Sequence, residues 1–128
     1  MTEPLRMDVE VWELLDMPGV VNIGASWGSN GFSAVVHDRD PRVSGHHPEL
    51  TRGLRETLGG VRWSKVRLDI WEDEGSGEIL IKLPGDGEFA TSVNERKGDP
   101  RYHLYLARML RRAVHDARAK EERGRAAG

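Results

Sequence analysis

The alternation of apolar and polar residues predicts a β-hairpin early in the chain. Apolar side chains occupy every second position from Val21 to Trp27 and again from Phe32 to Val36, which is the period of a half-buried strand. The stretch GSNG joins the two runs, and Asn-Gly favours tight hairpin turns because both residues tolerate a positive φ. Residues 20–37 are therefore predicted to form a hairpin.

Three further strand patterns lie in the second half of the chain, at residues 61–71, 78–84 and 88–93. The turn-forming stretches EDEGSGE and PGDG separate them. Because short connections join antiparallel neighbours, these three runs predict a three-strand meander.

Two shorter segments carry helical patterns. Residues 7–16 place apolar side chains at helical spacing, although a strand through Val9 and Val11 fits the same stretch. Residues 48–58 carry leucine at every fourth position, begin with proline and are followed by two glycines. A helix is predicted over each segment, with the strand kept as the alternative for the first.

The strongest helical pattern lies at the C-terminus. Asp99 is predicted as the N-cap, and Pro100 as the first helical residue, where its missing N–H costs nothing. Residues 124–128 are expected to fray. The apolar stripe of this helix is long enough to cover a sheet and consists of Tyr102, Tyr105, Leu106, Met109, Leu110, Ala113, Val114 and Ala117.

Together these elements predict an α+β fold in a single domain over residues 1–123. A mostly antiparallel sheet of about five strands, made of the N-terminal hairpin and the three-strand meander, would pack against a long C-terminal helix and a short middle helix. The chain has 128 residues and no cysteine, so its stability is expected to come from packing rather than from disulfides. No internal repeat is evident in the sequence.

Charge is unevenly distributed along the chain. Residues 1–100 hold 11 Lys and Arg against 18 Asp and Glu, whereas residues 101–128 hold 8 against 3, for a net charge of −2. Cations near the end of a helix complement its dipole, but they also form surfaces that attract anionic partners. Since no apolar run matches a signal peptide or a membrane span, a cytoplasmic protein without membrane contact is expected.

The strand at residues 61–71 carries the first candidate site. Its outward positions are predicted to be Trp63, Lys65, Arg67, Asp69 and Trp71, which alternate with core positions. Two aromatic residues that bracket two cations are typical of an aromatic-anchored interface, whereas the alternative is a second small core built from the four tryptophans. The favoured hypothesis is a non-enzymatic protein-binding or assembly module, with a protein partner or a second copy bound at Trp63, Lys65, Arg67 and Trp71.

The alternative hypothesis is RNA or ribosome binding through the basic C-terminal helix. The order helix–strand–strand–strand–helix over residues 48–123 resembles that of double-stranded-RNA-binding domains and of the ribosome-hibernation domain, which implies RNA as a partner. The resemblance is one of element order only, because the Lys-rich helix start is absent and the acidic stretch at 72–74 would repel phosphate. No family is assigned. The candidate nucleic-acid-binding residues are Arg101, Arg108, Arg111, Arg112 and Arg118.

The stretch VVHDRDPRVSGHHPEL holds the densest group of acidic and basic side chains. Pro48 at a first helical position predicts His47 as the N-cap and Glu49 in the first turn. A zinc site would need three or four converging ligands, and no catalytic constellation is complete. We therefore predict no metal site, no cofactor and no catalytic residue. The members of the group are His37, Asp38, Asp40, His46, His47 and Glu49.

Overall fold

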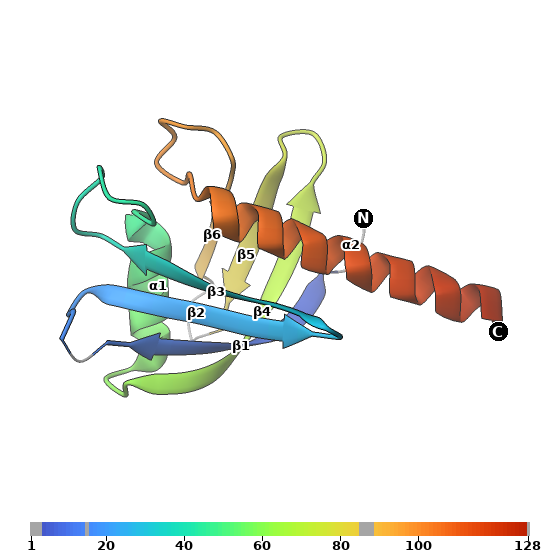
Figure 1. The fold of residues 1–128 in the computed structure, drawn as a ribbon, viewed down its shortest axis with the longest axis horizontal. Coiled ribbons are helices and arrows are strands. Elements are labelled where there is room, and N and C mark those ends of the chain that lie inside the picture. Colours follow the sequence, from blue (N-terminus) through green and yellow to red (C-terminus); the bar gives the residue numbers. More distant parts are fainter. Residues whose placement is uncertain (1–3, 15, 85–88, 128) are drawn as a thin grey trace.

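Two three-stranded meanders join along their first strands to form one six-stranded antiparallel sheet (Figure 1). The structure is a computed structural model that describes residues 4–14, 16–84 and 89–127. The strand order across the sheet is β3-β2-β1-β4-β5-β6. The strands are β1 (Leu5–Glu13), β2 (Val20–Trp27), β3 (Asn30–His37), β4 (Trp63–Asp73), β5 (Glu78–Leu83) and β6 (Phe89–Val93).

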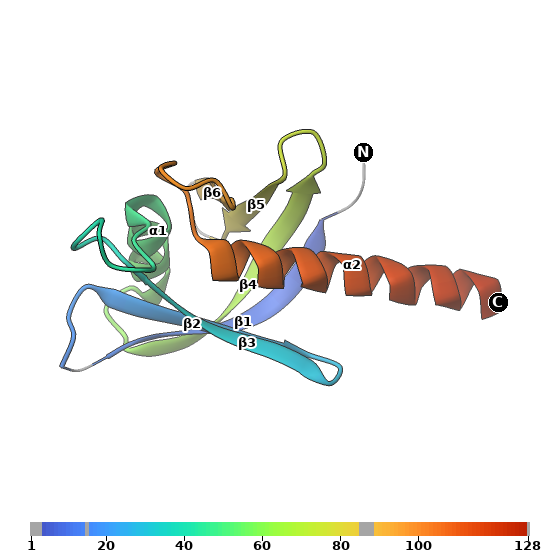
Figure 2. The ribbon, with the colours of Figure 1, turned by 45° about the horizontal axis from the view of Figure 1, so that its top comes forward.

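Each meander is followed by a helix, α1 (Pro48–Leu58) after β3 and α2 (Leu104–Ala127) after β6. Figure 2 shows α2 running across the sheet, and its C-terminal part projects beyond the strands in both views. This helix includes residues 124–127, where a frayed end was expected. Among the described residues, no helix is both long and apolar enough to cross a bilayer. The predicted α+β class, with a sheet packed against helices, is confirmed.

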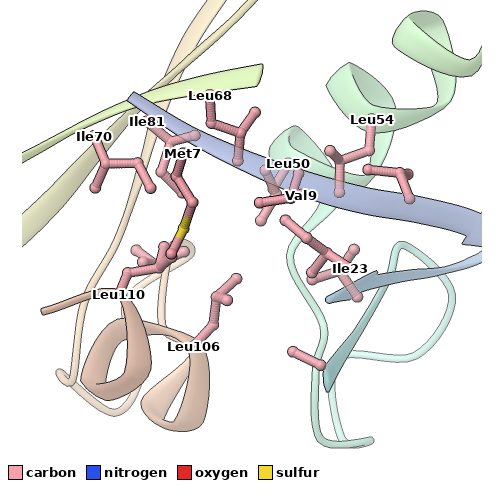
Figure 3. Close-up of a cluster of buried hydrophobic side chains, with 14 of the residues drawn as sticks. Met7, Val9, Ile23, Leu50, Leu54, Leu68, Ile70, Ile81, Leu106 and Leu110 are labelled. Atoms are coloured by element: carbon pink, nitrogen blue, oxygen red, sulfur yellow. The ribbon is translucent and has the colours of Figure 1, made fainter. Parts of the chain in front are cut away.

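The core lies between the sheet and the two helices (Figure 3). Val9 and Ile23 point from the strands towards Leu50 and Leu54 of α1, while Leu110 of α2 approaches Met7. All of these side chains are buried. Burial of a leucine or isoleucine side chain contributes about 1.5–3 kcal/mol, so this layer is the main source of stability in a chain without cysteine.

The helix predicted for residues 7–16 is wrong, because the segment forms β1 and raises the number of strands to six. Met7, Val9 and Val11 alternate with exposed residues and are buried. A strand places these three side chains on one face, whereas a helix would spread them around its axis. Strand β1 occupies the centre of the sheet between β2 and β4, so tertiary pairing decides between the two patterns.

The predicted start of the last helix is also wrong. Asp99 Oδ1 accepts a hydrogen bond from the Arg101 amide at 2.8 Å and closes a turn rather than a helix. A bridge between Asn94 and Tyr102 then keeps the chain extended. Helix α2 starts at Leu104, and His103 Nδ1 accepts the Leu106 amide at 3.2 Å as its cap. The predicted cap of α1 is confirmed, since His47 Nδ1 accepts the Leu50 amide at 3.1 Å.

The structure contains an internal repeat that the sequence prediction missed. Strands β1, β2 and β3 with α1 form one βββα unit, and β4, β5 and β6 with α2 form a second. The antiparallel β1–β4 pair lies at the centre, and the strands of each unit follow in the same order outward from it. The sequence signal is a shared pattern of His, Leu, Leu and Arg at positions 47, 50, 54 and 55 and again at 103, 106, 110 and 111.

Candidate functional site

The outer face of the sheet, defined as the face opposite the two helices, carries the four predicted partner-binding residues. Trp63 is 55% exposed, and Lys65 and Arg67 are also exposed. Trp71 is half-buried. Val66, Leu68 and Ile70, which alternate with them along β4, point inward and are buried, as the period-2 pattern predicted. Trp63, Lys65, Arg67 and Trp71 therefore share one strand face on the side of the sheet away from both helices.

The outer face has an apolar pair at each end of β4. Trp12 lies directly opposite Trp63 in the β1–β4 register. The Trp12 ring packs over Gly24, where an added Cβ would lie 3.3 Å from its Cζ3 and Cη2 atoms. Trp71 lies opposite Leu80, which is 39% exposed. The sequence prediction missed Trp12 because it assigned this residue to a helix, although its alternation with Val11 was a signal for the outer face.

Three rows of opposite charges cross the β1–β4 pair between these apolar pairs, and we call them the ionic rows. Arg67 Nε donates to Asp8 Oδ1 at 3.0 Å. The other rows are Arg6 with Asp69, whose Nε and Oδ1 atoms are 3.7 Å apart, and Glu10 directly opposite Lys65. Each row holds one cation and one anion, so the charges of the rows cancel. The predicted cations at positions 65 and 67 thus do not create a net positive surface.

Most of the candidate nucleic-acid-binding arginines are engaged in ion pairs within the chain. The shortest N–O distances are 3.3 Å from Arg101 to Glu49, 2.8 Å from Arg108 to Glu95 and 3.5 Å from Arg118 to Glu74. Arg111 pairs with both Glu72 and Glu95. Arg112 is exposed and makes no ion pair within the described part of the chain. Four of the five candidate arginines are therefore paired with acidic residues that precede them in the chain.

Arg55 and Arg111 occupy equivalent positions in the two βββα units. Arg55 Nη2 donates to Gly19 O at 3.1 Å and to Asp38 Oδ1 at 3.2 Å, and its Nε lies 3.6 Å from Glu13 Oε1. Arg111 repeats this arrangement. Its partners are Gly77 O at 2.7 Å, Glu72 Oε2 at 3.1 Å and Glu95 Oε2. The repeated contacts tie each helix to its own meander, which gives these arginines a structural role.

His47 and His103 are a second equivalent pair that connects the two units. His47 Nε2 donates to Ser92 O of β6 at 2.7 Å, and His103 Nε2 donates to Val35 O of β3 at 2.9 Å. Because each Nδ1 accepts a helix amide, both rings are neutral with the proton on Nε2. Burial lowers the pKa of both imidazoles below 6.5. The sequence prediction identified His47 as a cap but missed its bond to β6 and the whole role of His103.

The rest of the histidine-rich stretch shapes the connection between β3 and α1. His37 Nε2 lies 3.2 Å from Val43 O and 3.1 Å from Ser44 O, and its ring contacts that of His46 edge-on. Asp40 Oδ1 accepts the Arg42 amide at 2.9 Å, and the hydrogen bonds from Arg42 lower the pKa of this carboxyl. In the part of the chain that the structure describes, no three His, Asp or Glu side chains converge as metal ligands.

Comparisons with protein-family models, with curated proteins and with solved structures find no match to this chain. The outer face of the sheet, with its exposed Trp63, is the candidate functional site.

Proposed function

We propose that this protein is a non-enzymatic protein-binding module that holds its partner against the outer face of the sheet. The observation that carries the proposal is the exposure of Trp63, at 55%, on a face that packs against neither helix. Exposed tryptophans are uncommon on monomeric proteins and are enriched among the residues that dominate binding energy at protein interfaces.

The tryptophans do not form a second core. Of the four, Trp27 packs against the main core, while Trp12, Trp63 and Trp71 lie on the outer face and are absent from the buried cluster. The apolar pairs at the two ends of β4 can serve as anchors, and the neutral ionic rows between them fix orientation. Aromatic residues are enriched in the cores of protein interfaces, and the charged groups of an interface are arranged to be complementary to those of the partner.

The proposal is tested with a photo-crosslinking amino acid placed at position 63, in the cells that make the protein. Position 112, which is exposed on α2, is the matched control. We expect a crosslinked product of discrete mass from position 63 and none of that mass from position 112. The product should disappear when Trp71 is changed to alanine, and it should persist between about 50 and 200 mM salt, since an apolar contact is weakly screened. Equal crosslinking from the two positions would contradict the proposal.

A further inference from the structure

We infer that the partner is a second copy of this chain, packed outer face against outer face across the ionic rows. The inference rests on the proposed function, because it uses the same face, and it names the partner. The observation that supports it is the order of charges along the two central strands. Strand β1 presents plus, minus, minus at Arg6, Asp8 and Glu10, and the opposite residues of β4 present minus, plus, plus.

This pattern is complementary to itself in one orientation. A twofold axis that runs along the strands, between β1 and β4, places β1 of one copy over β4 of the other. Each ionic row then faces the same row with its ends exchanged, so Asp8 of one copy faces Arg67 of the other, and the reverse contact is also made. The same axis places Trp12 of one copy over Trp63 of the other. Every charge in the rows thus gains a second opposite charge, and the apolar pair contacts an apolar pair.

The other face-to-face orientation is disfavoured. A twofold axis that runs perpendicular to the strands, in the plane of the interface, places β1 of one subunit over β1 of the other and β4 over β4. Centred on the middle row, it brings Asp8 against Asp8 and Arg67 against Arg67. The two outer rows still meet opposite charges, so this orientation makes four favourable contacts and two unfavourable ones, whereas the strand-parallel axis makes six favourable contacts. Like charges that meet in an interface cost several kcal/mol, so the charge order selects the strand-parallel axis.

The curvature of the sheet decides which strands meet. The edge strands β3 and β6 are both bonded by the histidines at the starts of the helices, so the sheet curls around the helical side (Figure 2). The outer face is therefore convex, and the central strands β1 and β4 make contact first. With a strand spacing of about 4.8 Å and a rise of about 3.4 Å per residue, four strands of eight residues cover on the order of 500 Å² per copy. A dimer of this size belongs to the weak class, with a dissociation constant expected in the micromolar range.

The test is a charge exchange measured by sedimentation velocity at protein concentrations from about 5 to 500 µM, a range that brackets a micromolar dissociation constant. The middle ionic row is the Asp8–Arg67 pair. Asp8→Arg gives a chain with two cations in this row, and Arg67→Asp gives a chain with two anions. Alone, each variant should dimerise at least about tenfold more weakly than the parent chain, because like charges meet across the axis. Mixed in equal amounts, the two variants should form a heterodimer with restored affinity.

Two controls accompany the exchange. The chain that carries both substitutions should again form a homodimer, since its middle row is reversed but remains complementary to itself. Arg112→Glu, which reverses an exposed charge on α2, should leave the dissociation constant unchanged. Recovery in the mixture also shows that the single variants are folded.

A parent chain that stays monomeric up to the highest concentration would overturn the inference, and so would a mixture that remains monomeric while the parent chain dimerises. The proposed function would survive either result if position 63 crosslinks to a different polypeptide. It would fall only if that position gives no specific crosslink.

Discussion

His47 and His103 hold the two βββα units together by reciprocal bonds. Each ring caps the helix of its own unit through Nδ1 and donates from Nε2 to an edge strand of the other unit. The two donors reach Ser92 O on β6 and Val35 O on β3. One neutral imidazole therefore satisfies a helix amide and a strand carbonyl at the same time, which neither a carboxylate nor a hydroxyl could do across the same distance.

Substitution of His47 should separate its two roles. His47→Ala removes the cap and leaves the Ser92 carbonyl without its donor, so we expect a loss of about 2–4 kcal/mol in the free energy of unfolding. His47→Asn keeps an acceptor for the Leu50 amide but is too short to reach β6, so it should cost about 1 kcal/mol less than alanine. Urea unfolding measures both values, and the same pair of changes at His103 is the matched comparison. Equal losses for alanine and asparagine would show that the cap contributes nothing.

Stability should fall as the pH drops below the ordinary histidine range. Burial holds the pKa of His47 and of His103 below 6.5 in the folded chain, so the unfolded chain takes up these protons first. Their contribution is fully present above pH 6.5 and decreases below it, by up to about 1.4 kcal/mol per pH unit for each histidine.

The measurement is the free energy of unfolding at pH values from about 7.5 to 5.5, where glutamates remain ionised. The titratable groups that act on the two rings are Glu49 and His103 near His47, and His37 near His103. A double variant with asparagine at 47 and 103 should lose most of the slope. An unchanged slope in the double variant would assign the pH dependence to other groups.

Local patterns of the sequence predict more of this fold than of its site. The alternation along residues 63–71 predicts correctly which side chains of β4 face the core. The register between β1 and β4 cannot be read locally, since it brings Arg67 to Asp8 from 59 positions away. The ionic rows and the Trp12–Trp63 pair both depend on that register. The start of α2 was predicted wrongly for a related reason, because the Asn94–Tyr102 bridge is a tertiary contact that overrides a favourable local cap at Asp99.

Arg111 should contribute far more to stability than its neighbour Arg112. The Arg111 side chain is 24% exposed and bonds Gly77 O in addition to two glutamates. Arg111→Met leaves the Gly77 carbonyl and Glu95 short of donors, so we expect a loss of about 1–3 kcal/mol. Arg112→Met should stay within about 0.5 kcal/mol of the parent chain. Thermal or urea unfolding of the two variants checks the difference, and similar values would remove the structural role assigned to Arg111.

Retention on RNA should be weak and should end at moderate salt. Arg101, Arg108, Arg111 and Arg118 are already paired with carboxylates, so phosphate binding would have to break these contacts. We expect no RNA retention above about 150 mM salt. Reversal of both Arg108 and Arg112 to glutamate should leave RNA retention unchanged. Filter binding with double-stranded and single-stranded RNA across a salt series is the measurement. Tight binding with a steep salt dependence, lost on that reversal, would instead favour a nucleic-acid-binding function.

Gly45 should be the least replaceable glycine of the connection between β3 and α1. Its φ is +93°, and an added Cβ would lie 2.6 Å from Val35 O. The same oxygen accepts the hydrogen bond from His103 Nε2. Gly45→Ala combines a left-handed backbone with a clash against main chain that cannot move without breaking this bond, so we expect a loss of more than about 2 kcal/mol. Gly60→Ala is the control, since its φ of +94° matches that of Gly45 but the added Cβ meets nothing within 4 Å. Urea unfolding should therefore rank the Gly45 variant well below the Gly60 variant, and equal losses would show that the approach to Val35 can relax at no cost.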